Sequence, residues 1–257
     1  MNLGDRMKGY ENAHRVMLPS RFPIIIRLDG RAFHTFTRQV RFEKPFSQSF
    51  MDGMAWTAEN LCKEIMGAKF AYIQSDEISI LLTNDDTIET QPWFGNSLQK
   101  MVSVSASIAT VQFNNYVRRA LPFTFGAIPA TFDSRAFVIP ADEVVNYFIW
   151  RQMDAERNSL NGLCQSQFSH KSLQGLRREQ LHDKLHEKGI NWNDLPTQQK
   201  RGVTVILREG TWEIDREPPI FTEDRDYIES RMKKNKPKCS HCNSDCIDFI
   251  CLSCGSM

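Results

Sequence analysis

Hydrophobic residues along the chain follow two periods, one typical of strands and the other of helices. Short apolar or β-branched runs between turn residues predict strands at residues 22–28, 70–74, 78–82, 135–139 and 203–207. Apolar residues three or four positions apart predict one helix over 50–65, which ends before Gly67, and a long helix over 145–168. Strands and helices are therefore interspersed, and we find no internal repeat.

The segment 97–113 fits both periods. Val102, Val104, Ala106 and Ile108 alternate with serines as in a strand, yet the segment is long and holds no Gly or Pro. If it is a helix, the order of elements is β-α-β-β-α-β, the ferredoxin-like split βαβ arrangement with extra helices, and the fold class is α+β. The first two strands are then parallel, and the third lies antiparallel between them.

This topology brings carboxylates together at one edge of the sheet. The first strand leads into Asp29, and the turn between the second and third strands carries Asp76 and Glu77. Adjacent carboxylates repel one another unless a cation lies between them, and hard oxygen ligands suit Mg²⁺. Two such ions can clamp the attacking and leaving oxygens of a nucleotidyl transfer. Taken singly, each group is more typical of a plain turn or hairpin tip, so the site depends on the topology.

The loop after Asp29 adds a candidate phosphate site. Gly30 permits close approach of the backbone, and successive N–H groups as far as His34 can form a nest for a triphosphate. Polar residues and Lys44 follow this loop.

The composition excludes several classes of protein. A chain of 257 residues with 41% hydrophobic and 25% charged residues is typical of a soluble globular protein with a substantial core. Lys and Arg number 32 against 31 Asp and Glu, so contact with nucleic acid requires a local basic patch. No apolar run approaches the ~20 residues of a membrane helix, and residues 1–6 contain no apolar signal segment. We therefore expect a cytoplasmic protein without a membrane partner.

Five of the seven cysteines lie in the last nineteen residues. Two C-x-x-C pairs separated by eight residues predict a zinc ribbon, in which one structural Zn²⁺ is held by Cys239, Cys242, Cys251 and Cys254. A tail of this length cannot build a hydrophobic core, and metal binding must therefore supply its folding energy. The alternative is a disulfide-linked tail. Cys246 and His241 are spare metal-binding donors in the tail. Cys62 and Cys164 lie outside the tail, and we expect both to be buried thiols.

A basic run separates the cysteine-rich tail from the rest of the chain. Residues 231–238 contain five Lys or Arg side chains and one Pro, as in a solvated linker or a helix end. We predict a main domain of residues 1–228 and a second part, residues 229–257, that combines the basic linker with the zinc ribbon.

Three motifs resemble those of the tRNA(His) guanylyltransferase family. They are Arg-Leu-Asp-Gly-Arg-Ala-Phe-His at 27–34, Gln-Ser-Asp-Glu at 74–77 and Trp-Arg-Gln-Met-Asp at 150–154. Residues 4–11 are similar to the bacterial and archaeal branch, the guanylyltransferase-like proteins. The resemblance, which covers about residues 1–210, implies a palm-like nucleotidyltransferase domain similar to those of ordinary polymerases and GGDEF cyclases. It leaves out the zinc tail, whose candidate roles are an RNA clamp, an assembly element or a stabilising cap.

The resemblance also implies site residues and partners. Asp29 and Asp76, assisted by the Gly30 carbonyl, would carry two Mg²⁺ ions, with Glu77 supporting them as a third catalytic residue. Implied nucleotide-binding residues are Gly30, Arg31, Ala32, Phe33, His34, Lys44, Ser75 and Lys100, and weaker phosphate contacts are Lys200 and Arg201. The implied partners are tRNA, ATP and GTP or other NTPs, and family members assemble as homotetramers.

In the implied chemistry, ATP adenylylates the 5′-monophosphate of the RNA, and the 3′-hydroxyl of an incoming NTP then displaces AMP. Nucleotides are thus added to the 5′ end, in the 3′-to-5′ direction. Eukaryotic members carry His-Ile-Asn-Asn-Leu-Tyr-Asn after the third motif, whereas residues 156–162 here read Glu-Arg-Asn-Ser-Leu-Asn-Gly. This departure favours template-directed repair of 5′-truncated tRNA over strict addition of one guanosine to tRNA(His).

Two further alternatives are a palm-type cyclase-like enzyme that consumes NTPs and a non-catalytic RNA-binding protein. The Ser75-Asp76-Glu77 turn differs from the hairpin of a cyclase, and the carboxylates needed for catalysis are present.

Overall fold

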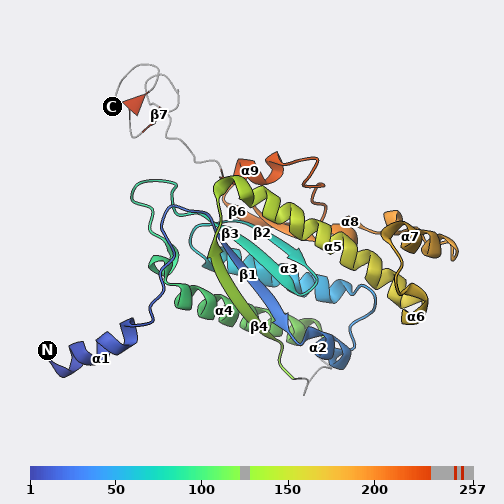
Figure 1. Cartoon of the computed structure of the whole chain (residues 1–257), viewed down its shortest axis with the longest axis horizontal. Coiled ribbons are helices and arrows are strands. Elements are labelled where there is room, and N and C mark those ends of the chain that lie inside the picture. The colour runs from blue at the N-terminus through green and yellow to red at the C-terminus, as the bar shows by residue number, and fades with distance from the viewer. Residues whose placement is uncertain (122–127, 233–245, 248–249, 252–257) are drawn as a thin grey trace.

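Six strands form one antiparallel sheet in the computed structural model, which describes residues 1–121, 128–232, 246–247 and 250–251 (Figure 1). The sheet strands are β1 Ile24–Arg31, β2 Ala68–Gln74, β3 Glu77–Leu82, β4 Thr131–Val138, β5 Val203–Arg208 and β6 Thr211–Asp215. The α-helices described are α1 Leu3–Asn12, α2 Phe33–Val40, α3 Gln48–Glu64, α4 Leu98–Ala120, α5 Val144–Gln167, α6 His170–Leu173, α7 Arg178–His186, α8 Thr197–Arg201 and α9 Asp226–Met232. Short 3₁₀ turns cover Trp93–Asn96, Ala141–Glu143 and Trp192–Asp194.

The order of the strands confirms the predicted topology. It reads β4-β1-β3-β2-β5-β6, and every neighbouring pair is antiparallel. β3 therefore lies between β1 and β2 and runs opposite to both. Because α3 precedes β2 and α4 precedes β4, the first four strands follow the β-α-β-β-α-β order. The end of β1 consequently lies beside the turn that joins β2 to β3.

Alternation along β1 produces two different faces of the sheet. Ile24, Ile26 and Leu28 belong to the core that α3 and α4 cover. Ile25 belongs to the opposite core, beneath α5 and α9 (Figure 1). Arg27 and Asp29 share the face of Ile25, so the charged end of β1 lies on the α5 side.

The ambiguous segment 97–113 lies in α4. Residues four positions apart are buried along this helix, which fixes its inner face: Met101, Ser105, Ala109, Phe113 and Val117. The alternation of valines with serines is thus incidental, because partly buried Val104 and Ile108 flank the same inner face. Packing against the sheet outweighs the local strand preference of the valines.

The C-terminal helix α9 packs on the sheet through Tyr227 and Ile228. The Tyr227 hydroxyl donates a hydrogen bond to Asp215 at 2.6 Å and lies 2.7 Å from the Thr204 hydroxyl. α9 runs across the predicted boundary between residues 228 and 229 and ends at Met232.

The tail beyond α9 is described only at two short strands. They are β7 Cys246–Ile247 and β8 Ile250–Cys251, which pair with Cys246 opposite Cys251. Three predicted zinc ligands lie outside the described residues: Cys239, Cys242 and Cys254.

The expectation of buried thiols at Cys62 and Cys164 is confirmed. Within the described ranges, every helix is too short or too polar to cross a membrane.

Candidate active site

The end of β1 and the β2–β3 turn bring the predicted carboxylates to one edge of the sheet. Asp29 pairs with Glu77 across β1 and β3, and the Gly30 N–H donates to the Asp76 carbonyl oxygen at 3.0 Å. The turn between the strands consists of two residues, Ser75 and Asp76, and Ser75 has a φ of 49°. The predicted meeting of these residues is therefore found.

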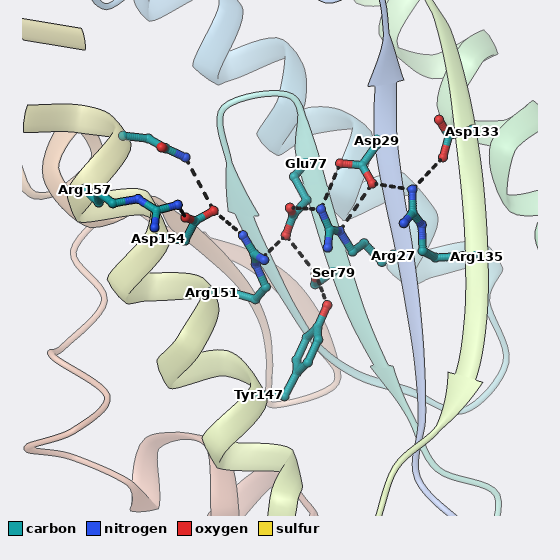
Figure 2. A network of polar contacts seen from close by, with 11 residues as sticks. Arg27, Asp29, Glu77, Ser79, Asp133, Arg135, Tyr147, Arg151, Asp154 and Arg157 are labelled. Atoms are coloured by element: carbon teal, nitrogen blue, oxygen red, sulfur yellow. Dashed lines mark hydrogen bonds and ion pairs between the residues drawn. The ribbon is translucent and has the colours of Figure 1, made fainter. Parts of the chain in front are cut away.

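Glu77 has both carboxylate oxygens in ion pairs (Figure 2). Its Oε2 atom lies 2.7 Å from Arg27, and its Oε1 atom lies 3.0 Å from the Nε atom of Arg151. The Ser79 hydroxyl adds a long hydrogen bond of 3.4 Å to Oε1. The side chains of Glu77 and Arg151 are only 8% and 4% exposed. Glu77 therefore links β3 to both β1 and α5.

Asp29 and Asp76 differ from Glu77 in their surroundings. The Oδ2 atom of Asp29 lies 3.3 Å from Arg27 and 3.2 Å from Arg135, and the carboxylate is 27% exposed (Figure 2). Asp76 is half-buried and forms no ion pair with any side chain in the described part of the chain. Of the three acids, Asp76 is the one left without a cation.

The ion pairs continue from Glu77 along α5. Arg151 also pairs with Asp154, and Asp154 pairs with the exposed Arg157 (Figure 2). This chain of contacts joins the edge of the sheet to the second half of α5.

Arg27 and Arg151 were missing from the residues expected from the sequence. Arg27 is the single charge in the apolar strand predicted over 22–28 and lies two positions before Asp29, so the period of two already places both on one face. Arg151 lies within the buried stripe of α5, between Phe148 and Ala155. A charged residue at such a position is rarely buried without a partner, which is the signal that could have found it.

Burial and like charge both act on Asp76. Burial raises the pKa of its carboxyl, hydrogen bonds within the turn oppose that shift, and the negative charge of Asp29 adds to it. Burial also raises the pKa of Glu77, against the opposite effect of Arg151 and Arg27. A cation at this edge favours the ionised form of Asp76 and so relieves the penalty.

Gly30 is required by the packing of the loop that follows it. A Cβ atom at Gly30 would lie 2.4 Å from the ring of Phe33. The Phe33 ring is buried among Phe36, Phe50, Phe113 and Phe132, with centroid distances of 5.0–6.0 Å. Ala32 adopts a left-handed φ of 55°, after which α2 begins. The first N–H groups of a helix have no acceptor within it, so the start of α2 can bind an anion.

A cavity of about 690 Å³ opens beside this edge of the sheet. Its volume is typical of a site for a small molecule or cofactor. Its walls come from α2, the segment 42–47, the β2–β3 turn, the second half of α5 and α8. It brings together six residues expected from the sequence: Phe33, His34, Lys44, Ser75, Asp76 and Lys200.

Other predicted residues do not reach this cavity. Lys100 lies in the first turn of α4, which follows the far end of β3, whereas the carboxylates lie where β3 begins. The fold therefore does not bring Lys100 to the site. Arg31 and Ala32 are exposed next to the cavity without lining it, and the Arg201 carbonyl oxygen accepts a hydrogen bond from Tyr72 at 2.7 Å.

No group of three or more His, Cys, Asp or Glu side chains that could hold a metal ion is found among the residues that the structure describes. A metal ion at the sheet edge would therefore take two side-chain carboxylates, those of Asp29 and Asp76, and complete its ligands from backbone or substrate oxygens. This is the way in which Mg²⁺ is commonly held beside phosphates.

Comparison with known proteins identifies the family. The sequence model of tRNA(His) guanylyltransferases (Thg1) matches residues 4–140, more than half of the chain. The chain belongs to the tRNA(His) guanylyltransferase family. It is accordingly a nucleotidyltransferase, and the resemblance inferred from its motifs is confirmed at this level.

Relatives within the family extend over nearly the whole chain. A bacterial guanylyltransferase-like protein in complex with ATP is 52% identical, with a TM-score of 0.85, over 90% of this chain and 99% of the other. A second such structure, in complex with GTP, is 45% identical with a TM-score of 0.77 over the same shares. The tRNA(His) guanylyltransferase of Schizosaccharomyces pombe is 30% identical over 241 residues, or 89% of this chain and 87% of the relative.

Proposed function

We propose that this protein adds nucleotides to the 5′ end of tRNA in the 3′-to-5′ direction and repairs 5′-truncated tRNA on a template. The observation that carries the proposal is the joining of Asp29 and Asp76 at one sheet edge, with Asp76 also lining a nucleotide-sized cavity. A reaction centre and a substrate site are thereby adjacent. Family relatives solved in complex with ATP and with GTP support nucleotides as ligands of this cavity.

The donors at the edge fit two Mg²⁺ ions, which would be held by Asp29, Asp76 and the Gly30 carbonyl. All three are hard oxygen ligands, and Asp76 has no arginine partner that a cation would have to displace. When bound, the ions stabilise the developing negative charge of a nucleotidyl transfer. Glu77 supports the site indirectly, because its oxygens hold Arg27 and Arg151.

The cavity would hold the NTP beside this edge. Lys44 and Ser75 in its wall can donate hydrogen bonds to phosphate oxygens, and so can the first amides of α2, those of Phe33 and His34. Phe33 fixes the loop by packing its ring into the core, so the amides are held in place before the ligand binds.

Two transfers make up the proposed reaction. An oxygen of the RNA 5′-monophosphate attacks the α-phosphorus of ATP, and pyrophosphate leaves. The 3′-hydroxyl of the incoming NTP then attacks the RNA 5′-phosphorus, and AMP leaves. The carboxylates of Asp29 and Asp76 would hold the cations beside the reacting phosphates, while the cavity orients the nucleotide for in-line attack.

Residues 156–162 bear on the choice of nucleotide. They replace the His-Ile-Asn-Asn-Leu-Tyr-Asn stretch of eukaryotic members, and Asn158, Ser159 and Gly162 line the cavity. The altered wall supports selection by base pairing with the opposite strand rather than a fixed guanosine. Strict addition of guanosine to tRNA(His) is the alternative, supported by the activity named for the relative from Schizosaccharomyces pombe.

The decisive experiment uses a 5′-monophosphorylated tRNA that lacks its first nucleotide, with Mg²⁺, ATP and each labelled NTP in turn. We expect incorporation only of the nucleotide complementary to the opposing base, and the preference should follow a mutation of that base. Addition of guanosine regardless of the opposing base would instead favour the strict guanylyltransferase activity. ATP consumption without incorporation would favour the cyclase-like alternative.

We further propose that Cys239, Cys242, Cys251 and Cys254 bind one structural Zn²⁺ and that residues 229–257 form a separate part after the main palm-like domain. A cytoplasmic homotetramer is the assembly expected from the family resemblance. Metal analysis and light scattering of the purified protein test the zinc content and the assembly.

A further inference from the structure

Two segments that reach the active-site end of the sheet contain arginines but no acidic residue. No Asp or Glu occurs within residues 30–42 or within residues 90–132, although the whole chain has 31 acidic residues. The first segment includes the end of β1 and all of α2, and the second includes all of α4. Their arginines are all exposed: Arg31, Arg38, Arg41, Arg118 and Arg119.

Aromatic packing brings the two segments side by side. The rings of Phe33 and Phe36 in α2 lie 5.4 and 5.9 Å from the ring of Phe113 in α4. Val40 and Val117 are buried in the same core. Arg38 and Arg41 flank Val40, and Arg118 and Arg119 follow Val117. The cations therefore lie next to buried residues of one core, in α2 and at the C-terminal end of α4, and Figure 1 shows these two parts of the chain close together.

These arginines are not neutralised within the described part of the chain. None of the five forms an ion pair there, and Arg118 instead donates to the side chain of Asn115. Arg27, Arg135 and Arg151 nearby are all held by carboxylates. Five exposed arginines that form no ion pair among the described residues give this region a positive potential that attracts a polyanion.

The same surface adjoins the candidate reaction centre. Arg31 follows Gly30 directly at the end of β1. His34 lines the cavity, and Arg38 lies one turn further along the same face of α2. The cations thus extend from the rim of the cavity to the end of α4.

We propose that this α2–α4 arginine surface binds the phosphodiester backbone of the RNA whose 5′ end reacts at Asp29 and Asp76. The proposal rests on the proposed function and adds the place of the RNA strand. Contacts to phosphates position a nucleic acid without reading its sequence. Such contacts suit an enzyme in which base pairing, rather than the protein, selects the nucleotide.

The test compares two double variants, R38Q/R41Q and R118Q/R119Q, with the full-length protein. Each should raise the Kd for 5′-truncated tRNA about tenfold or more near physiological salt, and the plot of log K against log salt should become shallower by about 0.7–0.9 per lost phosphate contact. The KM for ATP and the rate at saturating RNA should stay unchanged, because neither pair lines the cavity.

A matched control removes two cations at the other end of the sheet. In K63Q/R208Q the changed residues are exposed and lie near the start of β2 and at the end of β5. The control should leave both the RNA affinity and its salt dependence unchanged. An equal loss of RNA affinity in the control would show that the effect comes from the net charge of the protein, and it would overturn the proposed surface.

Other outcomes separate this proposal from the proposed function. Unchanged RNA affinity in both double variants, with active wild-type protein, would overturn the surface and leave the function standing. A raised KM for ATP with unchanged RNA affinity would assign the arginines to the nucleotide and also overturn it. If wild-type protein adds no nucleotide, the proposed function fails, while the binding measurement still decides whether the surface contacts RNA.

Discussion

Asp76 is the acid of the sheet edge that has no arginine partner among the described residues. Burial raises the pKa of both Asp76 and Glu77, but arginines oppose the shift at Glu77, whereas the negative charge of Asp29 adds to it at Asp76. Such a penalty is common where a protein is built to bind a cation or to carry out catalysis. Activity and stability should therefore respond in opposite directions when this charge is removed.

We expect Asp76→Asn to lower the rate of nucleotide addition by about 1,000-fold or more, because the loss of a metal-binding carboxylate removes several kcal/mol of transition-state stabilisation. Single-turnover addition to 5′-truncated tRNA measures the effect. RNA binding in the absence of Mg²⁺ is the control and should remain at the wild-type level. Retention of the wild-type rate would remove Asp76 from the reaction centre.

The same variant should be more stable than the wild type at pH 7. Because the pKa of Asp76 is raised in the folded protein by burial and by Asp29, the folded state binds a proton more tightly than the unfolded chain. The charge therefore opposes folding at neutral pH, and the penalty disappears as pH falls below the unfolded pKa of about 3.9. Urea unfolding without metal should show a gain for Asp76→Asn at pH 7 that shrinks on acidification. A loss of stability at pH 7 would contradict this sign.

Arg151 provides a second prediction at the scale of single residues. Its guanidinium is 4% exposed and pairs with both Glu77 and Asp154, so Arg151→Met leaves two carboxylates without this cation. Removing one partner of a buried ion pair costs about 3–5 kcal/mol, and urea unfolding should show a loss of this size in the free energy of unfolding. Arg151→Lys should recover only part of it, because an ammonium cannot reproduce the guanidinium contacts.

Arg157→Met is the matched control for this loss. Arg157 contacts the same Asp154 but is 71% exposed, so its removal should change the free energy of unfolding by less than about 0.5 kcal/mol. Equal losses in the two variants would show that burial of Arg151 is not the cause.

At the scale of elements, the sequence predicted most of the sheet and failed where local patterns conflict. Strands with continuous apolar runs, such as β2 and β3, were found because burial on both faces leaves an unambiguous signal. α4 stayed ambiguous, since its serines and valines alternate and only contacts with the sheet select the helix. α2 was missed altogether, because residues 30–34 were taken as a loop followed by polar residues, and the spacing of the buried Phe33, Phe36 and Val40 was overlooked.

The candidate site shows the same division. Asp29 and Asp76 could be joined from the sequence because strand order follows from the sequence of elements. Their arginine partners could not, since α5 supplies Arg151 from a helix whose docking on the sheet depends on the whole core. Lys100 came from the family resemblance, and its distance from the carboxylates follows from the direction of α4 on the sheet, which no single residue in the sequence reveals.

Gly30 allows a prediction at the scale of the loop and α2. In Gly30→Ala the added Cβ would overlap the Phe33 ring at 2.4 Å and push it out of the aromatic cluster. We expect a loss of about 1–3 kcal/mol in unfolding experiments and a weaker affinity for ATP, since Phe33 anchors the start of α2. Gly9→Ala is the control, because no atom lies within 4 Å of the added group. A fully stable Gly30→Ala with normal ATP affinity would mean that the loop is not held by this contact.

At the scale of the whole molecule, the reaction centre and the end of α9 lie at opposite ends of the sheet. Asp29 is near the end of β1, where it pairs with Asp133 at the start of β4. Met232 lies beside Ala141 and Val145, just after the end of β4. α9 therefore ends at the end of the sheet remote from the carboxylates.

This separation predicts how a chain that stops after Met232 behaves. The truncation should fold, because Tyr227 and Ile228 still fix α9 to the sheet through Asp215, Thr204 and the core. Its rate at saturating RNA should equal that of the full chain, since every residue of the candidate centre is retained. The zinc that we propose for the four tail cysteines should be lost, and RNA affinity should fall with a shallower salt dependence, because four of the five cations in 231–238 are removed.

Cys251→Ser in the full chain separates the two parts of this effect. It should release the zinc while keeping every cation, so an unchanged salt dependence in this variant would assign the electrostatic contribution to the basic run alone. A lower rate at saturating RNA in the truncated chain would contradict the separation, because it would require the tail to act at the distant edge where Asp29 and Asp76 meet. Equal RNA affinity of the truncated and full chains would instead make residues 233–257 dispensable for substrate binding and leave the α2–α4 arginine surface as the main source of contacts to phosphate.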